Sequence, residues 1–482
     1  MSPGKGRFLV AGAGVAGAAA ARALLEAGAQ VTVVDRRDGP ALAELAGLGA
    51  RTVITGEPDP ALLDGIDELV VSPGFAPHHP LVGAALDAGL EIYSEPELAW
   101  RMRGPGAPPW LAVTGTNGKT TTVTMLAAIL RAAGLRTAAL GNIGEPLVSA
   151  TGYDVLAVEL SSFQLHWSRD LAPHAGALLN VDKDHLDWHG SMCAYATAKK
   201  AIWRGAADGT GVALGNLDDR WVSTTLGDQP GRPVGWTVGR PAPGQFGVLD
   251  GMLVEHPADG GDPVELIEAS RVRPAGAHNV SNALAAAALA STHGVRPAAI
   301  RAGLAGYQPE GHRNAPVATV GGVDYVDDSK ATNPHAARAS LTSYPRVVWV
   351  AGGQLKGVLV DDLVAEIAPI LAGAVLLGTD RHLIRAALER HAGHVPMIEV
   401  ARTDDGAMAE VVRAAAGLAR PGDTVLLAPA AASLDMYTGY AQRGDAFAAA
   451  VAGLAAATPD PASGPGVRPD PASGPGVPPR AA

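Results

Sequence analysis

The chain has 482 residues, too many for one hydrophobic core, so we expect two to four domains. A formal net charge of -11 argues against nonspecific binding to nucleic acid or to a membrane surface. The single cysteine excludes an internal disulfide, and no apolar run is long enough to span a bilayer. Together these features favour a cytoplasmic protein.

Predicted strands and helices alternate up to about residue 107. Gly12-Ala-Gly-Val-Ala-Gly17 follows a short apolar strand and opens an Ala-rich helix, and the next strand ends at Asp35. This glycine pattern indicates a turn that binds the phosphates of NAD, FAD or any other nucleotide diphosphate. The alternative is a glycine turn that is needed only for close packing of the helix on the strand. Ser72 ends a later strand at the ligand-binding edge of the predicted sheet, where a serine is also a common turn residue.

A strand, a glycine-rich loop and a helix are predicted around Thr114-Gly-Thr-Asn-Gly-Lys-Thr-Thr121. Backbone N–H groups of such a loop and the dipole of the helix both favour a bound phosphate. Lys119 would contact the outer phosphates, and Thr120 would offer its hydroxyl to a magnesium ion. The alternative is a glycine-rich turn that begins an ordinary helix, because Val113 stands where the longer pattern has its first glycine.

Two further strand ends carry acids. Glu159 can hold the magnesium of a nucleotide or can serve as a carboxylate at the N-terminus of the following helix. Asp182-Lys-Asp-His-Leu-Asp187 indicates a catalytic or magnesium loop, because the ligand spacing of zinc sites is missing, with a solvated polar turn as the alternative.

Two helices carry candidate polar residues on otherwise apolar surfaces. Lys199 and Lys200 point to opposite sides of their helix, so we expect one of them to face inward with a lowered pKa. Asn279 and Asn282 lie one turn apart and can both reach a ligand, whereas N-capping accounts for only one of them. Between these helices, residues 232–274 predict a small antiparallel sheet.

From residue 324 onward, strands again alternate with helices, which predicts a second doubly wound α/β domain. The last segment, residues 456–482, repeats Pro, Gly, Ala and Ser and is expected to be disordered, because it cannot bury enough apolar surface to fold.

The order of these motifs resembles that of the Mur ligases of bacterial peptidoglycan synthesis, and the likeness extends to about residue 455. The resemblance is carried by Thr114-Gly-Thr-Asn-Gly-Lys-Thr-Thr, Gly141-Asn-Ile-Gly, Glu159-Leu-Ser-Ser-Phe-Gln, Asp184-His-Leu-Asp, Ala198-Lys199, His278-Asn-x-x-Asn282, His312-Arg313, Asp328-Ser-Lys-Ala-Thr-Asn333 and Ala432-Ser-Leu-Asp435.

The resemblance implies a mixed α/β chain of three domains and a tail. Residues 1–107 would form a Rossmann-like domain that binds a UDP-linked substrate. Residues 108–312 would form a central ATP-binding domain with a P-loop and a small antiparallel sheet. Residues 313–455 would form a Rossmann-like domain that binds an amino acid, followed by the tail at 456–482.

The activity implied by the resemblance is ATP-dependent ligation of D-glutamate to UDP-N-acetylmuramoyl-L-alanine through an acyl phosphate. ATP and two magnesium ions, for which Mn²⁺ can substitute, would be required. The protein would act in the cytoplasm as a monomer, without nucleic acid or membrane partners.

The resemblance also assigns candidate site residues. ATP would be bound by Gly115, Thr116, Asn117, Gly118, Lys119, Thr120, Thr121, Asn279, Asn282, Arg313 and Asp328. One magnesium ion would be held by Thr120 and Glu159, and the second by His185 and a carbamylated Lys199. The candidate catalytic residues are Lys119, Glu159, His185 and Lys199. The UDP-linked substrate would be bound by Gly14, Asp35, Arg37, Ser72, Asn142, Gln164 and His185. D-Glutamate would be bound by Asp184, Lys330, Thr332, Lys356, Ser433 and Leu434.

Three other functions are consistent with parts of the sequence. Another Mur ligase or a folylpolyglutamate-type ligase would share the phosphate loop. An NAD-dependent oxidoreductase would use the first glycine pattern, but it leaves the phosphate loop and Glu159 without a role. A nucleotide switch would need no pocket for an acidic amino acid.

Overall fold

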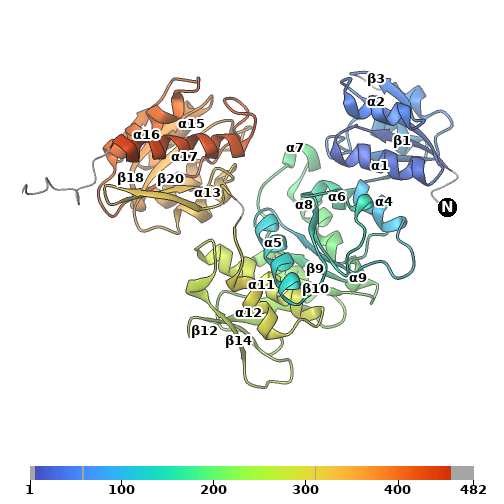
Figure 1. Cartoon of the computed structure of the whole chain (residues 1–482), viewed down its shortest axis with the longest axis horizontal. Helices are drawn as coiled ribbons and strands as arrows, with labels where there is room; N and C mark the ends of the chain where they lie inside the picture. Colours follow the sequence, from blue (N-terminus) through green and yellow to red (C-terminus); the bar gives the residue numbers. More distant parts are fainter. Residues whose placement is uncertain (1–5, 57–58, 310, 458–482) are drawn as a thin grey trace, which may run out of the picture. The chain divides into compact units, whose positions relative to one another are not determined.

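The computed structural model describes residues 6–56, 59–309 and 311–457 (Figure 1). Its Cα positions divide the chain into two compact units, Met1–Glu310 and Gly311–Ala482. The strands form sheets of five, nine and six strands with helices packed around them, which confirms the predicted mixed α/β fold. Except for its first two residues, the tail predicted at 456–482 lies outside the described residues.

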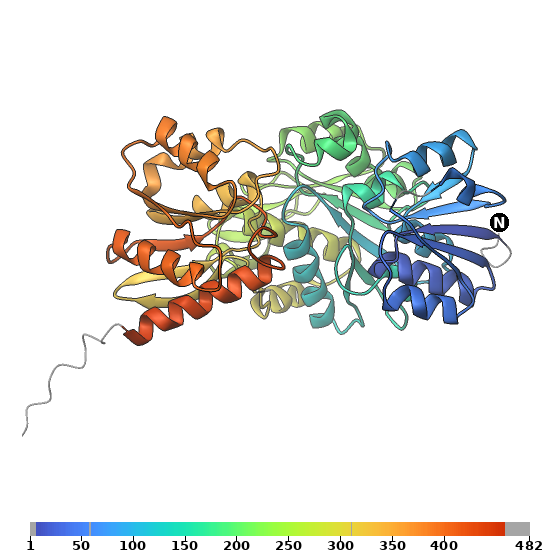
Figure 2. The same ribbon diagram turned by 90° about the horizontal axis from the view of Figure 1, so that it is seen from above.

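The first sheet is parallel and has the strand order β3-β2-β1-β4-β5. Its elements are β1 (Arg7–Ala11), α1 (Val15–Glu26), β2 (Gln30–Asp35), α2 (Pro40–Gly47), β3 (Arg51–Ile54), η2 (Pro60–Leu63), β4 (Glu68–Val71), α3 (Pro80–Asp87), β5 (Glu91–Tyr93) and α4 (Glu95–Arg101). Alternate residues of β1 face opposite sides of the sheet. Phe8 packs in an apolar cluster with α1 and α2, and Leu9 packs in another with α3. Helices therefore cover both faces of this sheet (Figure 2). The strand order reverses between β1 and β4, where such sheets bind ligands.

The turn between β1 and α1 depends on two glycines. Gly12 has a φ of +98°, and a Cβ on Gly17 would lie 1.9 Å from the carbonyl oxygen of Gly12. Because real side chains do not approach a backbone oxygen so closely, the tight turn and its helix require Gly17. The predicted glycine pattern therefore has at least a packing role here.

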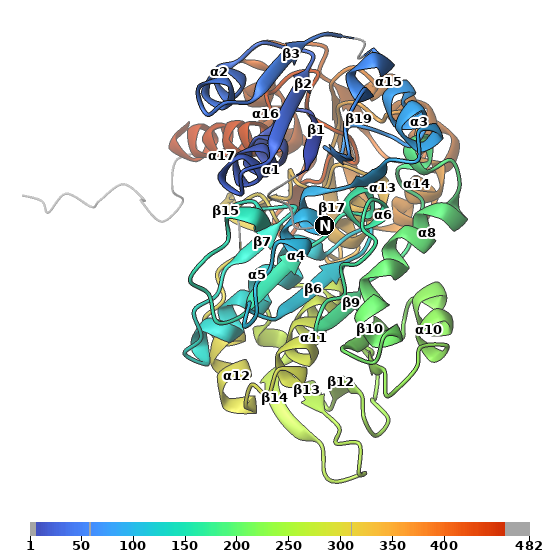
Figure 3. The same ribbon diagram turned by 90° about the vertical axis from the view of Figure 1, so that its right-hand side faces the viewer.

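The second sheet has the order β14-β13-β12-β11-β10-β9-β6-β8-β7 (Figure 3). Its strands are β6 (Trp110–Thr114), β7 (Ala139–Gly141), β8 (Leu156–Glu159), β9 (Ala175–Leu178), β10 (Val212–Asn216), β11 (Val234–Trp236), β12 (Phe246–Leu249), β13 (Met252–Glu255) and β14 (Val264–Glu268). Its helices are α5 (Lys119–Ala132), η3 (Leu147–Ser149), α6 (Ser162–His166), α7 (Leu186–His189), α8 (Met192–Lys200), η4 (Ala201–Trp203), α9 (Arg204–Ala207), α10 (Arg220–Gly227), η5 (Ala269–Arg271), α11 (Ala277–Thr292) and α12 (Pro297–Ala305).

The antiparallel hairpins predicted within residues 232–274 are present, but they extend the large sheet and do not form a separate one. The strands β12, β13 and β14 pair antiparallel, whereas β11 runs parallel to both β10 and β12. The pairing of β11 supplies partners for backbone groups that would otherwise be exposed at the edge of β10. The hairpins thus add three strands to one side of the central sheet.

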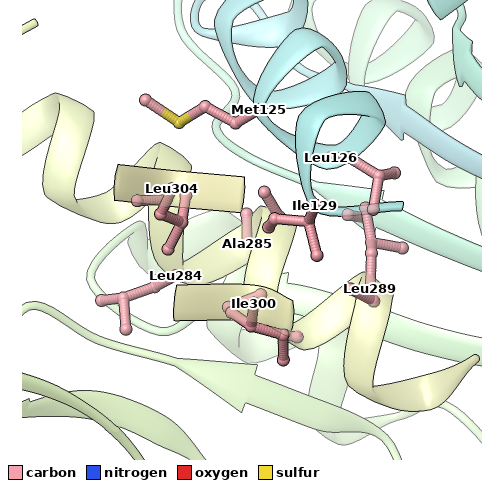
Figure 4. Close-up of a cluster of buried hydrophobic side chains, with 14 of the residues drawn as sticks. Met125, Leu126, Ile129, Leu284, Ala285, Leu289, Ile300 and Leu304 are labelled. Atoms are coloured by element: carbon pink, nitrogen blue, oxygen red, sulfur yellow. The ribbon is translucent and has the colours of Figure 1, made fainter. Parts of the chain in front are cut away.

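A tightly packed helical layer lies against the second sheet (Figure 4). It joins Met125, Leu126 and Ile129 of α5 to side chains of α11 and α12, among them Leu289 and Leu304. The phosphate loop precedes α5, so this layer fixes the helix that follows the loop.

Gly303 allows α12 to approach α5 closely. A Cβ at this position would lie 2.4 Å from the Cα of Ile129, so Gly303→Ala forces the two helices apart. We expect this variant to lower the free energy of unfolding by about 1 to 3 kcal/mol. The matched control is Gly83→Ala in α3, where nothing lies within 4 Å of the added methyl group. That change is expected to stabilise the helix by about 0.5 to 1 kcal/mol. Urea denaturation measures both, and equal effects would contradict this account of the packing.

The second unit contains a six-stranded sheet with the order β15-β16-β20-β17-β18-β19, in which only β15 and β16 pair antiparallel. Its strands are β15 (Ala315–Val320), β16 (Val323–Asp327), β17 (Val347–Gly352), β18 (Leu371–Leu377), β19 (Met397–Glu399) and β20 (Thr424–Leu427). Its helices are α13 (Pro334–Leu341), α14 (Asp361–Ile367), η6 (Ala368–Ile370), α15 (Arg381–His391), α16 (Ala407–Leu418) and α17 (Tyr440–Ala457). The predicted doubly wound domain is confirmed in this part of the chain.

Among the described residues, none of the helices combines the length and the apolar character needed to cross a membrane.

Candidate active site

The predicted phosphate loop lies between the buried strand β6 and helix α5. Gly118 precedes the helix with a φ of +83°, and no side chain caps the helix. Asn180 accepts a hydrogen bond from the N–H of Asn117 at 2.9 Å and so holds the loop from the neighbouring strand end. The loop fits a bound phosphate, since the start of an uncapped helix attracts anions.

Two lysine side chains meet at one carbonyl oxygen of this loop. The Nζ atoms of Lys119 and Lys199 donate to the carbonyl oxygen of Gly115, at 2.9 and 2.7 Å. Lys199 is 1% exposed, whereas Lys200 is exposed, so the prediction that one of the two lysines faces inward is confirmed. Burial lowers the pKa of Lys199 well below its usual value, and the nearby charge of Lys119 lowers it further. The lowered pKa of Lys199 favours its neutral amine form over that of an exposed lysine.

Glu159 ends β8 beside the strand that leads into the phosphate loop, in register with Val113. Its Oε1 accepts a hydrogen bond from Asn142 at 2.9 Å, and its buried Oε2 has no hydrogen-bond partner among the described residues. Ser161 and Gln164 cap α6, so Glu159 does not cap this helix. An unsatisfied carboxylate oxygen beside a phosphate loop fits the oxygen ligands that magnesium prefers.

His185 lies in the predicted acidic loop, with a left-handed backbone at a φ of 51°. Its Nε2 is 3.5 Å from Asp184, and Phe163 packs against its ring. Burial lowers the pKa of His185, an effect that Lys199 and Lys119 reinforce and Asp184 opposes. Within the described part of the chain, no cluster of three His, Cys, Asp or Glu side chains is placed to hold a metal ion. A metal at His185 would need a further ligand of another kind.

Tyr195 of α8 connects Lys199 to the phosphate loop. The tyrosine ring centre lies 4.5 Å from the Nζ of Lys199, and its hydroxyl is 3.0 Å from the Oγ1 of Thr116. Burial raises the pKa of Tyr195, which keeps its hydroxyl protonated. Tyr195 thereby holds α8 and its lysine against the loop.

Asn279 and Asn282 are buried near the start of α11, and no side chain caps that helix. The N-capping alternative is therefore wrong for both. Gly118 of the phosphate loop packs directly against Asn282, since a Cβ on Gly118 would lie 2.4 Å from its Oδ1. The structure thus brings Asn282 to the phosphate loop.

The first sheet places its candidate residues around the point where the strand order reverses. Asp35 accepts hydrogen bonds from the N–H groups of Ala13, at 2.6 Å, and of Arg37, at 3.1 Å. Burial raises the pKa of Asp35, but these hydrogen bonds outweigh burial, so the pKa lies below its usual value. Gly14 precedes α1, which has no side-chain cap, and a Cβ on Gly12 would lie 2.6 Å from the Oγ of Ser72.

A crevice between the ligand-binding edge of the first sheet and helix α6 is lined by Ser72 and Gln164. Gly17, Pro73, Phe163 and Trp167 also line it. The Oε1 of Gln164 accepts hydrogen bonds from the N–H and the hydroxyl of Ser161, so this side chain also has a structural role. Two of the residues predicted to bind the UDP-linked substrate therefore face one crevice.

In the second unit, candidate residues follow the carboxyl ends of the adjacent strands β16, β20 and β17. The Oδ1 of Asp328 accepts a hydrogen bond from the N–H of Asn314 at 3.1 Å, and burial raises the pKa of Asp328 to about 6. Arg313 lies within electrostatic reach of Asp328. The Nζ of Lys330 lies 3.9 Å from the ring centre of Tyr440. The other predicted residues at this edge are Thr332, Lys356, Ser433 and Leu434.

The sequence matches three families of known domains. Residues 6–94 match "Mur ligase MurD-like, N-terminal domain", residues 113–290 match "Mur ligase middle domain", and residues 312–431 match "Mur ligase, glutamate ligase domain". The chain belongs to the Mur ligase family.

Curated relatives of this Mur ligase bear the name UDP-N-acetylmuramoylalanine–D-glutamate ligase. The relatives from Thermobifida fusca and Streptomyces coelicolor are each 54% identical, and each match covers 93% of this chain and 98% of the relative. The relative from Mycolicibacterium smegmatis is 47% identical, and the match covers 94% of this chain and 97% of the relative.

Solved Mur ligase structures share the fold. The UDP-N-acetylmuramate–alanine ligase from Thermotoga maritima has a TM-score of 0.56 at 17% identity and covers 93% of this chain and 99% of its own. A pseudomurein peptide ligase from Methanothermus fervidus has a TM-score of 0.54 at 20% identity, with 88% and 96% covered.

Sequence reasoning missed a buried carboxylate that joins the first two sheets of this Mur ligase. Glu97 of α4 accepts hydrogen bonds from the N–H groups of Arg169, Asp170 and Leu171, at 2.9 to 3.0 Å, and from Arg101 at 2.8 Å. These contacts tie the first sheet to the segment after Gln164 and so support the crevice. The three backbone partners lie more than seventy positions away, so no local pattern reveals these contacts.

Proposed function

We propose that this chain is an ATP-dependent ligase that joins D-glutamate to UDP-N-acetylmuramoyl-L-alanine. The observation that carries the chemistry is the packing of Lys119, Lys199 and Glu159 around one phosphate loop. The choice of substrates is supported by relatives of that name, which are 54% identical over 93% of the chain. The boundaries expected at residues 107 and 312 remain our proposal for the domains of such a ligase.

The reaction requires activation, because a carboxylate resists attack by an amine. We infer that the terminal carboxylate of the UDP-linked substrate attacks the γ-phosphorus of ATP, which releases ADP and gives an acyl phosphate. The amino group of D-glutamate then attacks the acyl carbon, loses a proton and expels inorganic phosphate, leaving an amide. Most of the rate enhancement would come from positioning and from neutralising phosphoryl charge.

The phosphate loop would bind the nucleotide. The backbone of Gly115 to Gly118, with Thr121, would surround the phosphates, and Lys119 would contact the β- and γ-phosphates. Asn279 and Asn282 would contact adenine. Arg313 and Asp328 are our candidates for the ribose and the phosphates.

Two magnesium ions fit this residue set, because the buried Oε2 of Glu159 has no described partner and Thr120 is the second residue of the uncapped helix α5. Thr120 and Glu159 would hold one ion, and His185 with Lys199 the other. When bound, the ions would neutralise phosphoryl charge and polarise the transferred group.

Lys199 fits the second position only if it becomes anionic. We propose that its neutral Nζ adds to the carbon of CO₂ and loses a proton, forming a carbamate. This modification would turn the buried lysine into an oxygen ligand, which is the kind that magnesium prefers. The lowered pKa of Lys199 supports the first step, because only the neutral amine has a free lone pair.

The remaining candidates would bind the two molecules that are joined. Gly14, Asp35, Arg37 and Ser72 would contact the UDP group, and Asn142, Gln164 and His185 the muramoyl and alanyl groups. D-Glutamate would be bound by Lys330, Thr332, Lys356, Ser433 and Leu434 together with Asp184. The lysines would pair with its carboxylates.

Acceptor-dependent phosphate release tests this function against its rivals. With ATP, Mg²⁺ and UDP-N-acetylmuramoyl-L-alanine, we expect release only when D-glutamate is added. A stronger response to another amino acid would indicate a different ligase of the family. Release without any acceptor would indicate a nucleotide switch, and consumption of NADH would indicate an oxidoreductase. We further propose that the enzyme works as a cytoplasmic monomer without a nucleic acid or membrane partner.

A further inference from the structure

Arg443 is a buried arginine of the second unit for which the sequence analysis predicts no role. It lies in the first turn of α17 and is 1% exposed. Its Nε donates to the Oγ of Ser329 at 2.9 Å, and its Nη2 donates to the carbonyl oxygen of Ser329 at 2.8 Å. Its Nη1 donates to the carbonyl oxygens of Ala431, at 3.1 Å, and Gly352, at 3.3 Å.

These acceptors belong to three separate segments of the chain: Ser329 follows β16, Ala431 follows β20, and Gly352 is the last residue of β17. The same segments carry the residues proposed to bind D-glutamate, namely Lys330 and Thr332, Ser433 and Leu434, and Lys356. One guanidinium group therefore connects all three parts of the proposed amino-acid site. A lysine could not reproduce this arrangement, because it lacks the planar fork of five donors.

A backbone pairing and a glycine bring two of these segments close together beside Arg443. Gln354 and Ala432 pair through two backbone hydrogen bonds, of 2.8 and 2.9 Å, which join the segments after β17 and β20. A Cβ on Gly353 would lie 2.1 Å from the carbonyl oxygen of Ala432 and 3.3 Å from the Nη1 of Arg443. Gly353, with a φ of +133°, is thus needed for this close approach.

The guanidinium of Arg443 donates its hydrogen bonds to neutral oxygens and not to a carboxylate. Asp435 and Asp327 are nearby acids that act through electrostatics alone. Burial lowers the pKa of Arg443 to about 10, so the group stays protonated at neutral pH. Arg443 is therefore a buried cation directly behind the three segments.

We propose that Arg443 is a positioning residue for the acidic amino acid, fixing the three segments that bind it and adding positive charge behind them. This inference rests on the proposed function. It predicts a selective effect: loss of Arg443 weakens the use of D-glutamate and leaves the use of the UDP-linked substrate nearly unaffected.

Steady-state kinetics of two variants test the proposal. For Arg443→Lys, which keeps the charge but not the fork, we expect KM for D-glutamate to rise about tenfold. For Arg443→Met, which also removes the charge, we expect a rise of about a hundredfold. In both variants, KM for the UDP-linked substrate should stay within about twofold, because the residues proposed to bind it do not lie in this unit.

Phe447→Leu is the matched control, because Phe447 is one turn further along α17, fully buried and packed in an apolar cluster away from the three segments. It should lower the melting temperature without changing KM for D-glutamate. The proposal is overturned if Arg443→Lys raises KM for the UDP-linked substrate as much as KM for D-glutamate, or if Phe447→Leu reproduces its kinetic effect. Should Arg443→Met fail to fold, Arg443→Lys alone decides. If D-glutamate does not stimulate phosphate release by the wild-type enzyme, the proposed function is refuted, and this inference with it.

Discussion

Lys119→Ala is expected to lower kcat by at least about a thousandfold while the fold stays intact. Lys119 is the only side chain of the phosphate loop that carries a positive charge, and contacts that neutralise a transferring phosphoryl group have effects of this size. The half-buried side chain is not part of the apolar core around α5. The loop also keeps its hydrogen bonds to Asn180, so its conformation should survive.

Phosphate release and circular dichroism on the same sample measure both parts of this expectation. Lys200→Ala is the control, since Lys200 is an exposed lysine of α8. It should retain full activity. A Lys119→Ala enzyme with more than about a tenth of wild-type turnover would remove the phosphate-binding role from Lys119.

Lys199→Ala is expected to be inactive, with a loss of about a thousandfold or more, and to regain part of its activity with short carboxylic acids. The variant leaves room where the buried lysine and its carbamate would lie, so formate or acetate can supply the missing carboxylate oxygens. Such rescue is not expected from a lysine that only fills space or holds the loop.

The rescue is measured as phosphate release against increasing acetate, with chloride at the same ionic strength as the control. Full activity of Lys199→Ala without acetate would refute the proposal that a carbamate on Lys199 is needed for activity. Inactivity that no carboxylic acid relieves, in a variant with a wild-type melting temperature, would leave Lys199 with a role other than that of a metal ligand.

Local patterns in the sequence were sufficient to predict much of the fold. The strand–loop–helix at Lys119 and the glycine turn at Gly12 were predictable because hydrophobic periodicity and glycine spacing act within about twenty residues. The sequence of the helix also predicts that one of Lys199 and Lys200 faces inward, because the two lie on opposite sides of an otherwise apolar helix, but it does not say which of them does.

Contacts between distant segments were not predictable in this way. The bonds from Arg443 reach Ser329, Gly352 and Ala431, of which Gly352 lies 91 positions away. Their acceptors are mostly carbonyl oxygens, which every residue type possesses, so no composition signal marks them. The pairing of β11 with β10 was missed for a similar reason, because strand direction depends on the partner and not on the strand's own sequence.

The central claim, activation of a carboxylate by ATP before the amide forms, is tested most directly with isotope-labelled substrate. UDP-N-acetylmuramoyl-L-alanine carrying ¹⁸O in both oxygens of its terminal carboxylate is incubated with ATP and D-glutamate, and the released phosphate is analysed by mass spectrometry. Because the attacking carboxylate oxygen leaves with the phosphate, each phosphate should contain one ¹⁸O atom. Amide formation accompanied by phosphate that contains no ¹⁸O would contradict the account.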